Sequence, residues 1–112
     1  MIGNGQNKEE KTGIQYQIGE KVIIRTYSAG VWYGTLSQKE GKEVVITDAR
    51  RIWRWWAAKG ISLSAVALYG INQEKSRIAP KIEGVWLEAI EILPTTKDAQ
   101  ESIEGTKDAE AS

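Results

Sequence analysis

The sequence of 112 residues contains no cysteine, no histidine and no phenylalanine. Without cysteine and histidine there can be no disulfide framework, no Ser-His-Asp or Cys-His nucleophilic site and no ordinary zinc site. The imidazole that titrates near neutrality is absent, so acid–base catalysis would need a strongly perturbed carboxylate or lysine. We therefore expect a protein that is not an enzyme and uses no cofactor. A carboxylate- or metal-assisted hydrolase is the enzymatic alternative that remains.

Long apolar runs are also missing. No stretch approaches the roughly 18–20 apolar residues that a membrane-spanning helix needs. The first dozen residues, MIGNGQNKEEKT, lack the apolar region of a secretory signal. We expect a soluble, cytoplasmic protein of one domain with no membrane partner.

The charge is balanced overall but unevenly distributed along the chain. Fifteen basic and fifteen acidic residues give a pI of about 6.3, which excludes a uniformly basic nucleic-acid-binding protein. Residues 20–94 hold eleven Lys or Arg against eight Asp or Glu, whereas residues 95–112 hold two Lys against five acids. Four of the basic residues lie in an acid-free window, residues 49–59, which also contains three of the five tryptophans.

Both ends of the chain have the composition of flexible tails. Residues 1–13 contain three glycines and a single Ile after the first Met, and residues 95–112 contain one large apolar residue, Ile103. Such segments bury too little apolar surface to offset their chain entropy, so we predict that both are disordered. The alternative for residues 95–112 is a helix that folds only on a partner. A single folded domain at residues 14–94 follows.

The domain is predicted to be mostly β. Three strands at 20–27, 31–37 and 43–47 are rich in β-branched and aromatic residues and are joined by short turns at Gly30 and Gly41, so they form an antiparallel meander. Closing strands are predicted at 76–79 and 82–93, and a short extra strand at 14–18 is possible.

One helix is predicted at residues 62–70. Ser62 is a favourable N-cap, Leu63, Val66 and Ala67 share one face, and Gly70 can end the helix. Residues 48–56 are ambiguous: a helix is possible, but the density of tryptophan favours a strand. The fold class is therefore α+β, mostly β, with a small, strongly bent antiparallel sheet or barrel, one short helix and disordered termini. Exposed sheet edges favour homo-oligomerisation.

Two resemblances bear on this prediction. Part of the chain resembles the first half of Sm-like small β-barrels, which implies a barrel of the Sm or SH3 type; the matching residues are Val22–Arg25, Gly30, Gly34-Thr-Leu, Val44–Ile46 and Asp48. The loop that grips RNA in that family has no counterpart here, so no binding residue is carried over. The strings Arg-Thr-Tyr-Ser-Ala-Gly and Asp-Ala-Arg-Arg-Ile-Trp resemble a family of small uncharacterised proteins encoded by bacteriophages and prophages. This second resemblance covers about residues 21–94 and implies a viral accessory protein.

The acid-free window is the strongest candidate for a binding surface. Guanidinium groups can bind phosphate or carboxylate, and indole rings can stack on a base. A second cluster of Arg and Tyr surrounds the first hairpin turn, where stacking on a ligand or a structural cation–π contact is possible. The predicted ligand-binding residues are Arg50, Arg51, Trp53, Arg54, Trp55, Trp56, Arg25, Tyr27 and Tyr33. The alternatives for the window are that its tryptophans fill the core, with the arginines extending to solvent, or that it forms a protein–protein interface.

These observations support two hypotheses of function. The first is a non-catalytic phage accessory protein that binds nucleic acid or sequesters a nucleotide-type anionic ligand, with a counter-defence role. The second is a structural, virion or assembly protein that self-associates through the Trp-rich segment.

Overall fold

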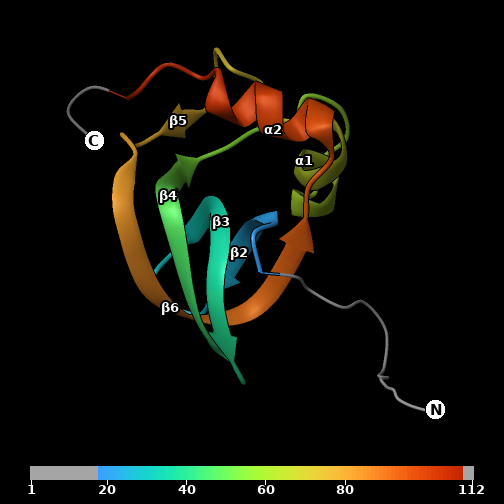
Figure 1. The fold of residues 1–112 in the computed structure, drawn as a ribbon. Coiled ribbons are helices and arrows are strands. Elements are labelled where there is room, and N and C mark those ends of the chain that lie inside the picture. The colour runs from blue at the N-terminus through green and yellow to red at the C-terminus, as the bar shows by residue number, and fades with distance from the viewer. Residues whose placement is uncertain (1–17, 110–112) are drawn as a thin grey trace.

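The structure is a computed structural model of the chain, and it describes residues 18–109 (Figure 1). The predicted N-terminal tail at 1–13, residues 14–17 of the possible extra strand and the last residues, 110–112, lie outside the described residues. Ile18, the end of the possible strand, lies in a turn.

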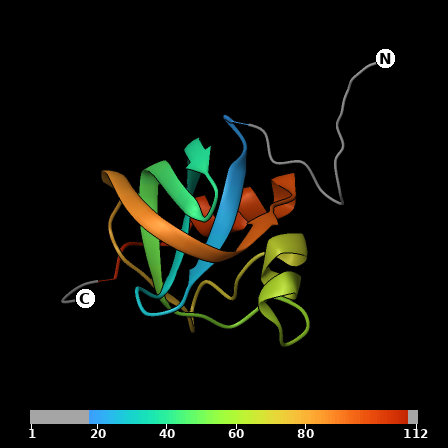
Figure 2. The same ribbon diagram turned by 90° about the horizontal axis from the view of Figure 1, so that it is seen from below.

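A small antiparallel β-barrel forms the body of the domain. Its strands are β2 (Lys21–Thr26), β3 (Val31–Glu40), β4 (Glu43–Arg54) and β6 (Ile82–Pro94), and the short β5 (Arg77–Ile78) pairs with the end of β4. The pairings β2–β3, β3–β4, β4–β6 and β6–β2 form a closed circuit. The first half of β6 pairs with β4 and the second half with β2, so β6 curves across the barrel (Figure 2). The predicted mostly-β, strongly bent antiparallel fold is confirmed.

Residues 43–54 form one continuous strand. The predicted third strand and the ambiguous Trp/Arg segment are both parts of β4, which confirms the preference for a strand up to Arg54. The pairing of β3 with β4 shifts register between Tyr33 and Thr35, and Asp48 on β4 has a φ of 48°. This irregularity bends the two strands where the barrel closes.

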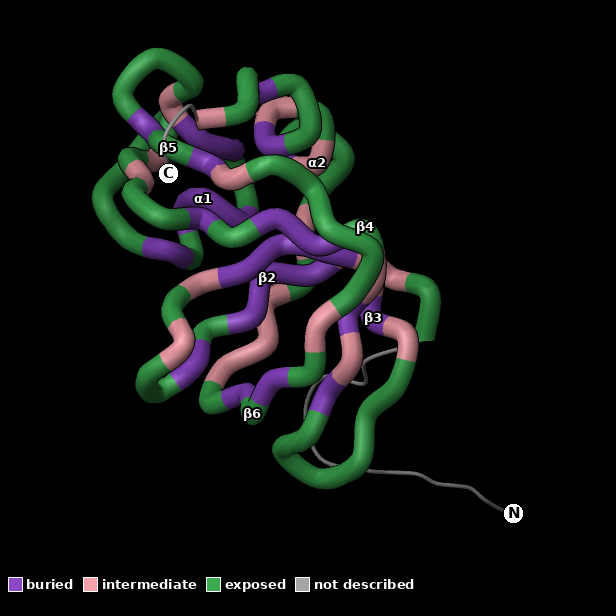
Figure 3. Tube along the Cα trace, turned by 90° about the vertical axis from the view of Figure 1, so that its left-hand side faces the viewer, coloured by how far each residue is buried: buried purple, intermediate pink, exposed green. Residues whose placement is uncertain are grey.

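The apolar core has two layers, because successive residues of a strand face opposite sides. Val22 and Ile24 face the barrel interior, where they pack with Trp32 and other buried side chains. Ile23, between them, faces the outer layer and packs with Tyr33 and residues of the helices. The continuous apolar run of β2 therefore serves both layers. Figure 3 shows the resulting buried stretches of β2, β3 and β4.

The predicted helix is confirmed as α1 (Leu63–Tyr69). The Ser62 side chain accepts a hydrogen bond from the Ala65 amide, and Gly70 ends the helix. A second helix, α2 (Lys97–Glu104), follows β6 and lies across one end of the barrel (Figure 1). No helix within residues 18–109 is long and apolar enough to cross a membrane.

Helix α2 corrects the prediction of a flexible tail at residues 97–104, so that folded structure continues beyond residue 94. Thr96 caps the helix, and its hydroxyl also donates to the Leu68 carbonyl at the end of α1. Ala99 and Ile103, four residues apart on one face, are completely buried. Composition averaged over eighteen residues hid this narrow apolar face. It is sufficient because Ile103 packs into an outer core layer that the strands and α1 have already formed.

Candidate functional site

The nine predicted ligand-binding residues do not form one surface. Arg50 and Tyr33 are buried beneath α2, and Trp55 is partly buried against the outer core layer. Arg25 forms an ion pair with Glu91 at 2.7 Å, and Tyr27 lies fully exposed at the first hairpin turn. Their role as ligand contacts stays a prediction, but the geometry divides them into separate environments.

Arg50 is a structural residue of the domain. Its guanidinium donates to the Ala79 carbonyl at 3.0 Å, to the Ile103 carbonyl at 2.9 Å and to Asp108 Oδ1 at 2.7 Å. These bonds join β4 to the segment before β6 and to the chain that follows α2. Arg50 thus joins the acid-free window to the acidic C-terminal region.

Tyr33 also contacts α2. Its hydroxyl donates to Glu104 Oε2 at 2.5 Å, and the same oxygen accepts a bond from Lys21 at 2.8 Å. Burial raises the pKa of Tyr33 far above its usual value, and the carboxylate of Glu104 adds to the effect. Burial alone would raise the pKa of Glu104, but the bonds from Lys21 and Tyr33, together with the nearby charges of Lys21 and Lys81, lower it.

Arg51 covers a tryptophan of the core. Its guanidinium carbon lies 4.3 Å from the centroid of the Trp32 ring, and it donates to the Ala29 carbonyl at 2.8 Å. Trp32 belongs to the barrel interior, so Arg51 closes that end of the core with a cation–π contact.

The remaining predicted residues, Trp53, Arg54 and Trp56, are exposed and lie at the end of β4. Beyond β4 the chain runs antiparallel to residues 70–76. The Asn72 amide donates to the Trp56 carbonyl at 2.7 Å, and Ala57 forms a bridge with Ile71. These contacts bring two segments that are distant in the sequence into one ribbon of backbone.

Three cation–aromatic pairs lie along this ribbon and where it meets α1. Arg54 lies 5.2 Å from the Trp53 ring centroid, Lys75 lies 5.4 Å from Trp56, and Lys59 lies 5.1 Å from Tyr69. The aromatic residues are half-exposed, at 59 %, 55 % and 50 % for Trp53, Trp56 and Tyr69. Arg77 on β5 lies opposite Arg54 and is added to these pairs. We call the seven residues the cation–aromatic surface: Trp53, Arg54, Trp56, Lys59, Tyr69, Lys75 and Arg77.

The four cations of this surface are free to meet an anion. Within residues 18–109, none of Arg54, Lys59, Lys75 and Arg77 forms an ion pair with a carboxylate. Arg77 donates only to backbone carbonyls, those of Glu74 and Ser76. The surface therefore combines uncompensated positive charge with exposed ring faces, which is the pattern found where proteins bind single-stranded nucleic acid.

Four of these seven residues were missed from the sequence: Lys59, Tyr69, Lys75 and Arg77. Lys59 closes the acid-free window, so its charge was a signal that could have included it. The other three lie ten to eighteen residues further along the chain. The pairing of residues 54–58 with residues 70–77 places Lys75 beside Trp56 and Arg77 opposite Arg54, and Tyr69 lies near Lys59.

No group of three or more Asp, Glu, His or Cys within residues 18–109 is arranged to bind a metal ion.

Comparison with protein families shows that residues 19–103 match the family described as Domain of unknown function (DUF6948). The chain belongs to this family. The DUF6948 match spans the barrel, α1, most of α2 and the whole cation–aromatic surface, while Glu104 and Asp108 lie beyond it. Comparison with curated proteins and with solved structures finds no match.

Proposed function

We propose that this DUF6948 protein is a non-catalytic binding protein for single-stranded nucleic acid. Bases stack on Trp53, Trp56 and Tyr69, and phosphates meet the cations beside these rings. A free nucleotide carries the same chemistry, a base and a phosphate, and the experiment below separates the two ligands.

The observation that carries the proposal is the repeated pairing of a half-exposed ring with a cation that has no carboxylate partner. Stacking of one base on an aromatic side chain contributes about 1–3 kcal/mol. Removing one ring should therefore weaken binding by roughly 5- to 150-fold. The binding constant should also depend less on salt. Each lost phosphate contact should reduce the magnitude of the slope of log binding constant against log salt concentration by about 0.7.

We also propose that the protein is phage-encoded and acts as an accessory, counter-defence protein in the cytoplasm of a bacterial host. The resemblance of residues 21–94 to phage and prophage proteins supports this origin. The absence of cysteine and histidine from the chain suits a protein that sequesters its ligand rather than converting it. A survey of the genomic position of DUF6948 genes tests the origin, and genes that lie outside phages and prophages would contradict it.

The binding experiment is fluorescence anisotropy with a labelled oligothymidine of about twelve nucleotides, competed with duplex DNA and with linear and cyclic mononucleotides. Trp53→Ala and Trp56→Ala should each weaken binding, and Lys75→Gln should lower its salt dependence. Trp86→Ala is the matched control, because Trp86 is 56 % exposed on β6 and lies outside the cation–aromatic surface. It should bind like the wild type.

The outcomes separate the two hypotheses of function. Tight binding of a mononucleotide with weak binding of the oligomer would replace the nucleic-acid ligand by a nucleotide. Exposed Trp residues are also common anchors of protein interfaces, so light scattering is measured on the same proteins. An oligomer that Trp53→Ala dissociates, in a protein that binds no nucleic acid or nucleotide, would overturn the proposal in favour of a self-associating structural protein.

A further inference from the structure

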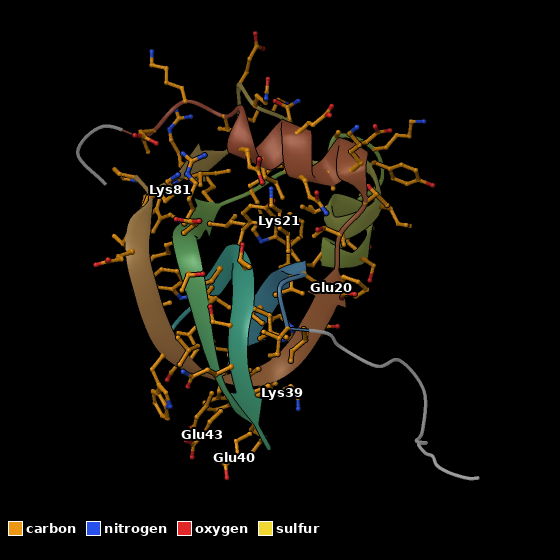
Figure 4. All side chains as sticks on the ribbon, in the orientation of Figure 1. Glu20, Lys21, Lys39, Glu40, Glu43 and Lys81 are labelled. Atoms are coloured by element: carbon orange, nitrogen blue, oxygen red, sulfur yellow. The ribbon has the colours of Figure 1, made fainter. Side chains whose placement is uncertain are left out.

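A polar hollow of about 360 Å³ lies under α2 and shares no residue with the cation–aromatic surface. Figure 4 shows Lys21 and Lys81 at this end of the barrel, whereas Lys39, Glu40 and Glu43 lie at the opposite end. Three cations and three carboxylates line the hollow: Lys21, Arg50, Lys81, Asp48, Glu104 and Asp108. Its net charge is therefore zero, although its walls are highly charged.

Two of these charged side chains form no direct ion pair within the described residues. Lys21 is paired with Glu104 at 2.8 Å and Arg50 with Asp108 at 2.7 Å. The exposed side chains of Lys81 and Asp48 form no direct ion pair or hydrogen bond with any residue of 18–109, and the charge of Lys81 acts on Glu104 from a greater distance. The hollow thus presents one ammonium and one carboxylate that are exposed and have no direct ion-pair partner.

A further acceptor is available on Glu104. Both of its side-chain hydrogen bonds, from Lys21 and from Tyr33, go to Oε2, so Oε1 has no donor within the described chain. Tyr33 is almost completely buried, which fixes the position of the carboxylate it contacts.

The backbone presents Asp48 to the hollow in an unusual conformation. Asp48 is the only non-glycine residue among residues 18–109 with a positive φ, 48°. The facing Gly34 approaches β4 so closely that a Cβ there would lie 2.9 Å from the Thr47 carbonyl oxygen. Bulges and left-handed residues of this kind are enriched at binding and active sites.

We propose that the hollow binds a small zwitterion with one ammonium and one carboxylate group, of the size of a free amino acid. The carboxylate of the ligand pairs with Lys81, and its ammonium group is bound by Asp48 and by Oε1 of Glu104. A ligand with only one charge would pair with either Lys81 or Asp48 but not with both. The volume of the hollow lies at the small end of the range of ligand sites, which suits a molecule of this size.

The test measures thermal unfolding of the protein by calorimetry, with each of the common L-amino acids as the probe. At ten times its Kd, a bound amino acid should raise Tm by about 5 °C. Acetate and ethylammonium, which each carry one of the two charges, should have no effect. Asp48→Asn keeps a side chain that tolerates positive φ, and it should weaken binding at least about tenfold, as should Lys81→Gln.

Glu83→Gln and Lys42→Gln are the matched controls, because both residues are exposed and neither lines the hollow. They should bind the amino acid like the wild type. The proposal is overturned if no amino acid binds, if acetate binds as well as the best amino acid, or if Asp48→Asn and Lys81→Gln leave binding unchanged. Unliganded Tm values of the variants show that each is folded. Because the two sites share no residue, Trp53→Ala should leave amino-acid binding intact.

Discussion

Replacing Arg50 by methionine removes the connection between β4, the segment before β6 and the chain after α2. The side chain of Arg50 is 7 % exposed, and methionine fills a similar volume without a donor. The carbonyls of Ala79 and Ile103 each lose a bond from a charged donor. The third partner, Asp108, has a side chain that is 62 % exposed and is rehydrated when the pair is lost.

The expected loss of stability follows from these three bonds. A hydrogen bond from a charged group contributes about 1.5–3 kcal/mol, and the apolar burial of methionine offsets part of the loss. The exposed partner contributes less than about 1 kcal/mol. Arg50→Met should therefore cost about 3 kcal/mol, whereas Asp108→Asn, which keeps an acceptor for the guanidinium, should cost less than about 1 kcal/mol.

Urea unfolding of the two variants measures the difference. The midpoint for Arg50→Met should fall by about 2 M with an unchanged slope, and that for Asp108→Asn by much less. Hydrogen exchange gives a local check, because the Ala109 amide donates to the Ile78 carbonyl next to the lost bonds and should exchange faster. Equal destabilisation by the two variants would refute the reasoning, since it would assign the stability to the exposed ion pair rather than to the buried carbonyl bonds.

Two further predictions concern the contacts of α2. Gly70→Ala should cost at least about 2 kcal/mol, because a Cβ there would lie 2.5 Å from Ser102 Cβ and φ is 94°; Gly41→Ala, with φ 60° and no atom within 4 Å, is the control and should cost less in urea unfolding. The free energy of unfolding should be constant between about pH 6 and 9, because the chain has no histidine. It should fall below about pH 4.5 as Glu104, whose pKa is lowered on folding, is protonated, and again above about pH 10, where the unfolded state ionises Tyr33 but the folded state does not. Glu104→Gln should reduce the acid loss and Tyr33→Phe the alkaline loss in midpoints measured across pH; unchanged pH profiles would contradict both assignments.

The strands and the first helix could be predicted because their signals are local. The β-branched run of β2, the turn at Gly30 and the Ser62 cap each act within a few residues. Helix α2 also carries local signals, the Thr96 cap and the spacing of Ala99 and Ile103, but an acidic composition concealed them. The stability of α2 comes from packing on the outer core layer, and the amino-acid composition of a segment does not reveal such packing.

Part of the cation–aromatic surface could be predicted from the sequence, again because its signal is local. Trp53, Arg54 and Trp56 lie within four residues of one another, so the sequence showed their density. Tyr69 and Lys75 join them only through pairing of distant segments. Equally, Arg50 looked like its neighbours in the sequence, and only the position of α2 distinguishes a buried structural arginine from an exposed one.

By itself, the sequence determined the residue chemistry available to this DUF6948 protein and the local backbone preferences, because both depend on side-chain identity and near neighbours. The missing cysteine and histidine, the meander, α1 and the basic, Trp-rich window all follow from it. Tertiary structure decided which charges are neutralised and which face solvent, because that depends on contacts between segments up to 83 residues apart, such as Lys21 with Glu104. Closure of the barrel and docking of α2 thus separate the cation–aromatic surface from the charged hollow beneath the helix.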